Sequence, residues 1–354
     1  MKTVKSLLML GAAGLALGFT ACSDETDETP VYGPEGSISF NVTVPKATRA
    51  TVTTTNTIDN FRVWAFVDGQ RFMDGVEVTR PGEGHNWVYS PIMYWPIGQT
   101  VNFYGISPSD ITTATAPVAG DANPDIPGFV NRDGLTDLLY SVNMQEQESG
   151  RVQVNFRHAL SQLRFKFRRL ERPSSEIRVE VIGVDLVGAN SVGDFRFPRE
   201  TTTSSSNEKV RGTWVNQRTV RTDNLYTGRA VTLTDDYEGI DDIKYSFAIP
   251  QPLQAGVADD TSVGVFARVK CAIYDEDTNL KLWPKAGTEG YDPSSGTAYI
   301  YFPLRNDKSN VTAWEPGKSY NYNITIGVPQ TSTTIGFDVT VDDFSEFQDE
   351  DLNN

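Results

Sequence analysis

The chain has 354 residues, and its 46 Asp and Glu against 31 Lys and Arg give a formal net charge of −15 at pH 7. So acidic a protein is poorly suited to bind nucleic acid or an anionic membrane surface, because like charges repel each other. The length favours two domains, and the presence of only two His and two Cys excludes most metal sites, His-based catalytic triads and a disulfide framework.

The first residues have the pattern of a secretory signal. Two lysines precede an apolar stretch over residues 7–19, and a small residue, Ala21, comes directly before Cys22. A basic start, a short apolar run and a small residue at the exit are typical of signal peptides. We therefore interpret residues 1–21 as a lipoprotein signal peptide. Cys22 lies in a motif that resembles a bacterial lipobox, so we expect it to be the lipidated first residue of the mature chain, anchored by its acyl chains.

The segment after Cys22 is acidic and lacks large apolar side chains over residues 23–30. Such a segment cannot pack into a core, so residues 22–36 are predicted to be a flexible acidic tether. An acidic stretch directly after the lipidated cysteine also resembles the surface-export signal of Bacteroidales lipoproteins. We therefore expect the protein in the outer membrane, displayed on the cell surface.

Most periodic segments farther along the chain alternate apolar and polar residues, as strands do. Segments of this kind are residues 61–67, 101–106, 152–156, 163–167, 178–184, 245–250 and 320–326. Gly, Pro and Asn separate them, and Asp68-Gly69 is a hairpin signal, so the sequence predicts an all-β protein built of β-sandwich domains. A polar stretch at 146–150 is interpreted as the boundary between an N-terminal β-sandwich over 37–150 and a C-terminal β-sandwich over 151–354.

Two heptapeptides at opposite ends of the mature chain carry nearly the same pattern. In a strand, each would present one apolar row, because side chains alternate between faces. The two rows are Ile38, Phe40, Val42 and Val44, and Ile335, Phe337, Val339 and Val341. Two strands with the same row can fill the same place, one from inside the molecule and one from a neighbour. The alternative is that both are ordinary half-buried strands.

Residues that carry catalysis or bind metals are scarce in this chain. His85 lies in a Gly-rich turn, and His158 is expected to be a structural residue at a strand. Residues 275–279 begin like a calcium loop, but Leu280 stands where that loop requires Gly, so a hairpin turn is predicted. Cys271 shares its parity with apolar neighbours and is expected in a core. We therefore expect no catalytic residues, no metal and no cofactor.

Trp residues on a secreted β-sandwich can stack on sugar rings. Trp95 and Trp283, each followed by Pro at a strand edge, are expected instead to cap a core. A surface glycan-binding lipoprotein of the outer membrane remains the alternative function.

Three phrases resemble the Bacteroidales fimbrillin family, whose members are Mfa-like and FimA-like lipoprotein pilins. The phrases are residues 93–96 followed by 101–108, residues 156–165 with a His-Ala-Leu motif, and residues 314–320. They occur in the family's order along the mature chain. The resemblance implies a non-enzymatic structural subunit of a surface fimbrium, with two transthyretin-like β-sandwich domains in tandem and a role in adhesion.

The same resemblance implies assembly by strand exchange. In such pilins an Arg-specific protease cuts the lipoprotein precursor after its first strand, and a terminal strand of another pilin subunit replaces that strand. Here the first strand is followed by a Thr-rich loop that contains Arg49 and Ala50, and loop tips of this composition are preferred cleavage sites. The alternatives are cleavage at Lys46 or Arg62, or an ordinary loop residue at Arg49. Residues 38–44 would then be the displaced strand, and residues 335–341 the donor strand, an assignment that rests on the repeated pattern.

Overall fold

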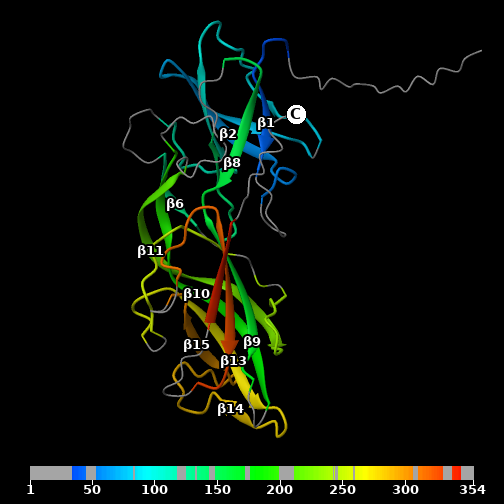
Figure 1. Ribbon diagram of the computed structural model, residues 1–354, viewed down its shortest axis with the longest axis vertical. Helices are drawn as coiled ribbons and strands as arrows, with labels where there is room; N and C mark the ends of the chain where they lie inside the picture. Colours follow the sequence, from blue (N-terminus) through cyan, green and yellow to red (C-terminus); the bar gives the residue numbers. More distant parts are fainter. Residues whose placement is uncertain are drawn as a thin grey trace, which may run out of the picture.

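The computed structural model describes residues 34–44, 53–82, 84–117, 125–131, 134–142, 148–171, 176–198, 211–241, 243, 246–257, 260–305, 310–329 and 337–343. Every regular element in these ranges is a β-strand, so the predicted all-β fold is confirmed. The described residues contain no helix that is long and apolar enough to cross a membrane. The molecule is elongated, with β1 and β2 in the upper half of Figure 1 and β9, β13 and β14 in the lower half.

The first sheet occupies the upper half and has seven strands. In spatial order they are β1 (Ser39–Thr43), β8 (Arg151–His158), β7 (Leu139–Val142), β5 (Val101–Ser107), β2 (Asn60–Val67), β3 (Gln70–Thr79) and β4 (Val88–Tyr89). The pair β1–β8 is parallel and the other neighbours are antiparallel. Asp68 and Gly69 join β2 to β3 with φ values of 47° and 74°. This left-handed pair is what a two-residue hairpin turn requires, so the predicted hairpin is confirmed.

The first sheet curls until its two ends meet beside β1. Ser37 forms an antiparallel bridge with Tyr94, and the Ile38 amide donates to the Met93 carbonyl at 2.8 Å. The Tyr89 hydroxyl of β4, the last strand of the sheet, donates to the Ile38 carbonyl at 2.8 Å. The sheet therefore wraps around a core of its own, to which β1 contributes one wall.

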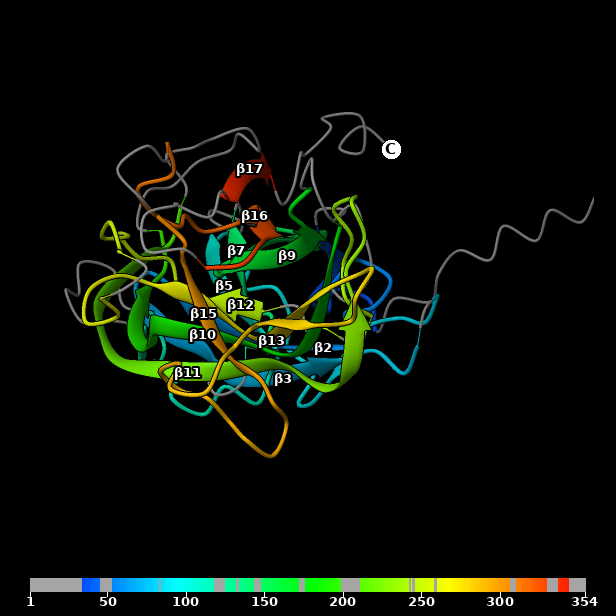
Figure 2. The ribbon, with the colours of Figure 1, turned by 90° about the horizontal axis from the view of Figure 1, so that it is seen from below.

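Two further sheets form the lower half. One contains β11 (Thr213–Thr232), β10 (Ile177–Arg196), β13 (Phe266–Asp275) and β14 (Lys281–Trp283), with β15 (Ala298–Pro303) on β13 and β6 (Ile126–Val130) on β10. The other has the order β12 (Ser246–Ala248), β9 (Ser161–Arg169), β16 (Lys318–Ile326) and β17 (Phe337–Asp343). Seen from below, these sheets form two layers (Figure 2). The core between them contains residues from both sheets, including Val181, Val269, Phe165 and Tyr322.

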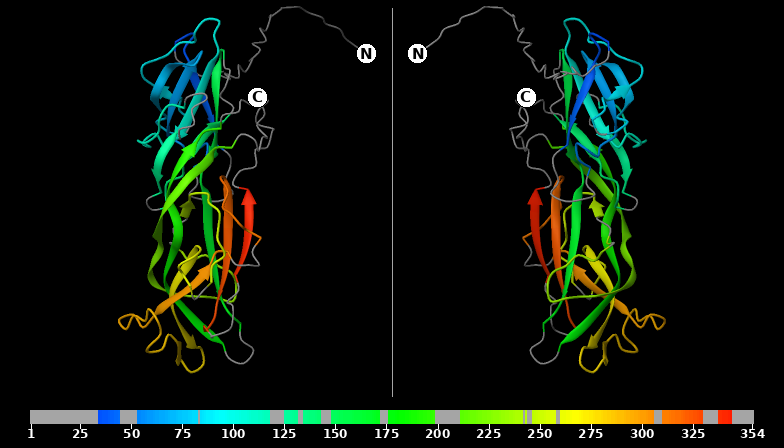
Figure 3. Two further views of the ribbon diagram at one scale, coloured as in Figure 1. Left: turned by 90° about the vertical axis from the view of Figure 1, so that its left-hand side faces the viewer. Right: turned by 90° about the vertical axis from the view of Figure 1, so that its right-hand side faces the viewer.

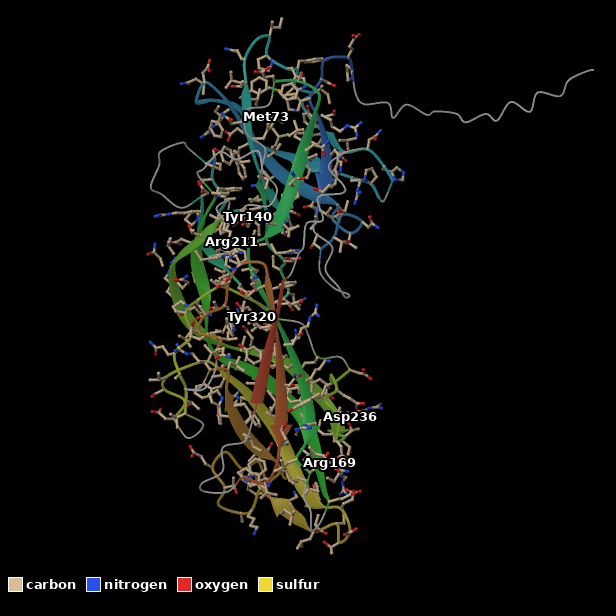
Figure 4. The ribbon with its side chains drawn as sticks, in the orientation of Figure 1. Met73, Tyr140, Arg169, Arg211, Asp236 and Tyr320 are labelled. Atoms are coloured by element: carbon tan, nitrogen blue, oxygen red, sulfur yellow. The ribbon has the colours of Figure 1, made fainter. Side chains whose placement is uncertain are left out.

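A third hydrophobic cluster joins the two halves. Tyr140 of β7 meets Phe195 of β10 with ring centroids 5.0 Å apart, and Phe195 meets Trp214 of β11 at 5.2 Å. The Trp214 indole donates to the Ala159 carbonyl at 2.6 Å. Figure 4 shows Tyr140 at mid-length of the molecule. The halves are therefore joined by packed side chains as well as by the chain itself.

Sheet membership does not follow the predicted boundary at residue 150 in a simple way. β8 lies after that boundary in sequence but belongs to the first sheet, and β6 lies before it but pairs with β10. The division into two independently folding domains stays a prediction.

Two smaller predictions are confirmed in the lower half. Cys271 is fully buried, and burial raises the pKa of its thiol, so it behaves as an apolar core residue. The Asp275 carboxylate accepts bonds from the amide and hydroxyl of Thr278 at 2.8 and 2.6 Å, in a turn between the antiparallel strands β13 and β14.

In the part of the chain that the structure describes, no group of His, Cys, Asp and Glu is arranged to hold a metal ion.

Candidate functional site

The apolar row of β1 is buried along its whole length. Ile38, Phe40, Val42 and Val44 are 2%, 5%, 4% and 4% exposed and belong to the core of the first sheet. The intervening side chains of β1 are only partly buried. The alternation read from the sequence is therefore present in the fold, and β1 fills a row of positions in this core.

Phe40 makes the largest contribution to this row. Its ring meets Phe61, Tyr89 and Phe103 edge-on, with centroid distances of 5.6, 5.5 and 6.1 Å. Such edge-to-face contacts are favourable beyond the area that they bury. Burial raises the pKa of Tyr89, so this hydroxyl keeps the proton that it donates to Ile38. Phe40 thus sits in an aromatic pocket that accepts one large ring.

β1 is an edge strand of its sheet. It pairs with β8 over its full length, from Ser39 opposite Arg151 to Thr43 opposite Asn155. On its other edge, contacts come from residues 93–95 at the start of the strand and from Thr55 at its end. There the Thr55 hydroxyl accepts from the Val44 amide at 2.9 Å and donates to the Val44 carbonyl at 3.0 Å. Leaving the sheet would break the ladder to β8 and these few bonds at the two ends of the strand.

Polar side chains connect β1 to β8 on the face opposite the core. The Asn41 amide donates to Gln153 Oε1 at 2.8 Å, and the Thr43 hydroxyl donates to Asn155 Oδ1 at 2.6 Å. Sequence reasoning missed Gln153 and Asn155, although their alternation with Val152 and Val154 would have placed them on one face of a strand. That strand's pairing with β1, 112 residues away, could not be read from this pattern.

Asp137 ties the loop after β1 to β8. One carboxylate oxygen accepts the Thr53 amide at 2.9 Å, and the other lies 2.8 Å from His158 Nδ1. Both His158 and Asp137 are buried. His158 is therefore a structural residue, as predicted, and it helps fix the point where the chain rejoins the first sheet.

The C-terminal strand β17 is also at the edge of its sheet, in the other half of the molecule. It pairs only with β16 among the described strands, antiparallel, with Phe337, Val339 and Val341 opposite Ile324, Tyr322 and Tyr320. Those three β16 side chains are buried. Figure 3 shows β17, in red, on the outside of β16. Both strands of the repeated pattern therefore have a single strand neighbour.

Four predicted site residues lie outside the described residues. These are Cys22, Arg49, Ala50 and Ile335. The described chain ends at Val44 before the predicted cleavage site and resumes at Thr53 after it.

The tryptophans mainly pack on cores. Trp283 and Trp314 are buried, and Trp95 meets Phe103 with centroids 5.9 Å apart. Trp87 packs on Phe61 at 5.2 Å, and the Arg80 guanidinium lies 4.9 Å from its ring. Trp87 and Trp95 are thus half-buried against aromatic side chains, as expected of rings that cap a core.

Comparison with known proteins identifies the class to which this elongated β-sheet protein belongs. A family model described as fimbrillin-like matches residues 48–343. The chain belongs to the fimbrillin-like family, so the resemblance read from its sequence is confirmed and the chain is a fimbrial protein, not an enzyme. No curated protein is similar to it in sequence.

Two solved structures are similar to this chain. A fimbrial protein from Bacteroides vulgatus ATCC 8482 superimposes with a TM-score of 0.53 at 14% identity, over 87% of this chain and 99% of the other. A fimbrilin from Porphyromonas gingivalis W83 gives a TM-score of 0.44 at 10% identity, over 86% of this chain and 96% of the other. The first of these likenesses shows a shared fold.

Proposed function

We propose that this protein is a structural subunit of a surface fimbrium that assembles by protease-triggered strand exchange and supports adhesion. The observation that carries the proposal is β1: an edge strand with one strand neighbour, whose four apolar side chains fill a core. The sequence places Arg49 five residues after that row ends, outside the described residues. One cut there would separate β1 from the rest of the chain.

The energetics favour a subunit that stays closed until it is cut. Burying four side chains of this size stabilises the fold by about 6–12 kcal/mol, at roughly 1.5–3 kcal/mol for each. If β1 left, the chain would expose that apolar surface together with the unpaired edge of β8. An unpaired sheet edge can pair with a strand of another chain. The intact chain should therefore remain monomeric, and cleavage should make the place of β1 available to residues 335–341 of a neighbour.

The remaining features of the proposal concern export and architecture. Cys22 would carry the lipid that anchors the precursor in the outer membrane, and an Arg-specific protease would release the mature subunit at the cell surface. The two halves of the molecule would be transthyretin-like β-sandwich domains in tandem. Other pilin subunits, identical or related, would be the partners in the fimbrium. Family membership and the sequence pattern around Cys22 support this proposal.

The deciding experiment treats the unlipidated precursor with an Arg-specific protease, because a protease that also cuts after Lys could cleave at Lys46 in the same loop. We expect a new N-terminus at Ala50 and a ladder of oligomers, because cleavage frees the place of β1. Arg49→Ala should stay uncut in that loop and monomeric, whereas Arg62→Ala, within β2, should behave as the parent does. If Arg49→Ala assembled as the parent does, Arg49 would not be the cleavage site. A cleaved chain that stays monomeric and binds polysaccharide would favour the glycan-binding alternative.

A further inference from the structure

The two repeated segments agree in their polar positions as well as in their apolar row. Asn41 and Thr43 lie between the apolar residues of the first segment, and Asp338 and Thr340 stand at the matching positions of the second. The apolar row explains why both could enter one core, but it does not require any likeness on the other face. A likeness on the polar face would matter for assembly only if side chains of a neighbouring strand contact that face.

The structure provides such a partner on β8. Asn41 donates to Gln153 at 2.8 Å, and Thr43 donates to Asn155 at 2.6 Å, in a parallel ladder that sets Asn41 opposite Gln153 and Thr43 opposite Asn155. Gln153 is exposed and Asn155 is 5% exposed, so the second bond is shielded from water. Asn41 and Thr43 are therefore each matched by one amide side chain of β8.

We propose that Gln153 and Asn155 set the register and direction of the strand that replaces β1, by pairing with Asp338 and Thr340 of a second copy of this chain. The inference rests on the proposed strand exchange and adds the residues that determine how the new strand is placed. Because the repeated pattern reads in the same N-to-C order, the incoming strand runs parallel to β8, as β1 does. Phe337 then faces Val152 and takes the aromatic pocket of Phe40.

The apolar row alone leaves the register incompletely specified. A slip of one residue would turn the apolar row to solvent and is excluded for that reason. A slip of two residues keeps the same face inward, so it must be opposed by something else. A slip in either direction would move Phe337 out of the aromatic pocket. One direction would also set Thr340 opposite Arg157 instead of Asn155, and the other would leave Asn155 without Thr340 by setting Thr340 opposite Gln153. Ring size on one face therefore opposes both slips, and pairing with Asn155 on the other face favours the same register.

The replacement of Asn41 by Asp338 in the second segment also fits this site. Asp338 can only accept hydrogen bonds, whereas Asn41 donates, and the amide of Gln153 can present either its oxygen or its nitrogen. Arg151 lies opposite Ser39, two residues from Gln153 on the same face of β8. Diagonal neighbours at this spacing are within reach of long side chains, so a carboxylate at the position of Asn41 meets a favourable charge. The incoming strand is thus matched to β8 at least as well as β1 is.

Disulfide trapping in the assembled polymer tests direction and register together. In a parallel ladder, Gln153→Cys should cross-link to Asp338→Cys of the neighbour, and Asn155→Cys to Thr340→Cys. The swapped combinations, Gln153→Cys with Thr340→Cys and Asn155→Cys with Asp338→Cys, should not cross-link. Cys271 is buried and Cys22 leaves with the cleaved segment, so neither should interfere.

Cross-linking of both swapped pairs without the matched pairs would show an antiparallel strand, and cross-linking of a single swapped pair would show a slipped parallel strand. Either result would overturn this inference while leaving strand exchange intact. A cleaved chain that never polymerises would overturn both proposals.

A competition measurement checks that the two amides contribute to recognition. A synthetic peptide of residues 335–343 should inhibit polymerisation of the cleaved subunit. Asn155→Ala should weaken that inhibition by about 2- to 10-fold, the size expected for one neutral hydrogen bond. Gln153→Ala should weaken it by at least as much, because its partner Asp338 is a charged carboxylate. Gln99→Ala, which removes an exposed glutamine outside β8, is the matched control and should change nothing. Equal inhibition in all variants would show that Gln153 and Asn155 do not contribute to recognition of Asp338 and Thr340.

Discussion

At the scale of single residues, Phe40 would link the stability of the intact chain to the proposed strand exchange. Its ring is 5% exposed and has three aromatic neighbours, yet it belongs to a strand held by one backbone ladder. Most of what keeps β1 in place is therefore side-chain burial. A strand with the same row can supply that burial equally well.

Phe40→Ala should lower the free energy of unfolding of the uncut chain by about 3–5 kcal/mol, because a buried ring is replaced by a cavity. Ser39→Ala, on the partly exposed face of the same strand, should change it by less than about 0.5 kcal/mol. Urea unfolding followed by tryptophan fluorescence measures both. A loss below about 1 kcal/mol in Phe40→Ala would mean that β1 contributes little to this core.

At the scale of elements, Asp194 shows how the long hairpin of β10 and β11 is held in shape. Irregularities in the register interrupt this hairpin, one of them between Val192 and Asp194. Asp194 accepts from the Gly128 amide at 2.7 Å and from the Asn216 side chain at 2.8 Å, and it pairs with Arg218 at 3.3 Å. One carboxylate thus joins β6, β10 and β11.

The pKa of Asp194 predicts how this junction responds to acid. Burial alone would raise the pKa, but the bonds from Asn216 and Gly128 and the charge of Arg218 outweigh it and hold the pKa below its ordinary value. A carboxyl whose pKa is lowered by folding stabilises the fold above its unfolded pKa of about 3.9. That stability is lost as the pH falls through the folded pKa.

Asp194→Asn should therefore cost about 1 kcal/mol at pH 7. The difference from the parent should shrink below about pH 4, where Asp194 of the unfolded chain becomes protonated, and should be lost as the pH falls through the lower folded pKa. Asp236→Asn, at an exposed carboxylate in the lower half (Figure 4), is the control and should be neutral at both pH values. Urea titrations at pH 7 and pH 3 make the comparison. A constant difference between parent and Asp194→Asn would contradict this account.

At the scale of the whole molecule, the cluster of Tyr140, Phe195 and Trp214 decides whether the two halves behave as one body. It takes residues from the first sheet and from both sheets of the lower half. The place of β1 lies in one half and β17 lies in the other, so in a polymer a rigid junction would carry force between successive strand contacts. The junction is as relevant to a fimbrial subunit as the exchanging strands are.

Trp214→Ala should break this coupling, because it removes a buried ring and its bond to the Ala159 carbonyl. We expect the parent to unfold in one calorimetric transition and the variant, about 3–5 kcal/mol less stable, to unfold in two. Val220→Ala, at a β11 side chain that is 67% exposed, should keep the single transition. Two transitions in the parent would show instead that the halves are independent domains.

Several parts of the fold follow from local sequence. Strict alternation predicts which side chains of β1 are buried, the left-handed preference of Asp68-Gly69 predicts the hairpin, and the parity of Cys271 predicts its place in a core. Short motifs were enough to indicate the family, since they reflect turns and strand ends that neighbouring residues specify.

Only the tertiary structure decided which strands are neighbours. Alternation determines which face of a strand is buried, but not which other strand supplies the hydrogen bonds, because any strand with a matching row satisfies it. For this reason the parallel pairing of β1 with β8, the transfer of β6 to β10, and the roles of Gln153 and Asn155 could not be read from the sequence. The side-chain pattern of a strand is local, whereas the choice of its neighbouring strand is not. For this reason a strand of one subunit could complete the sheet of another.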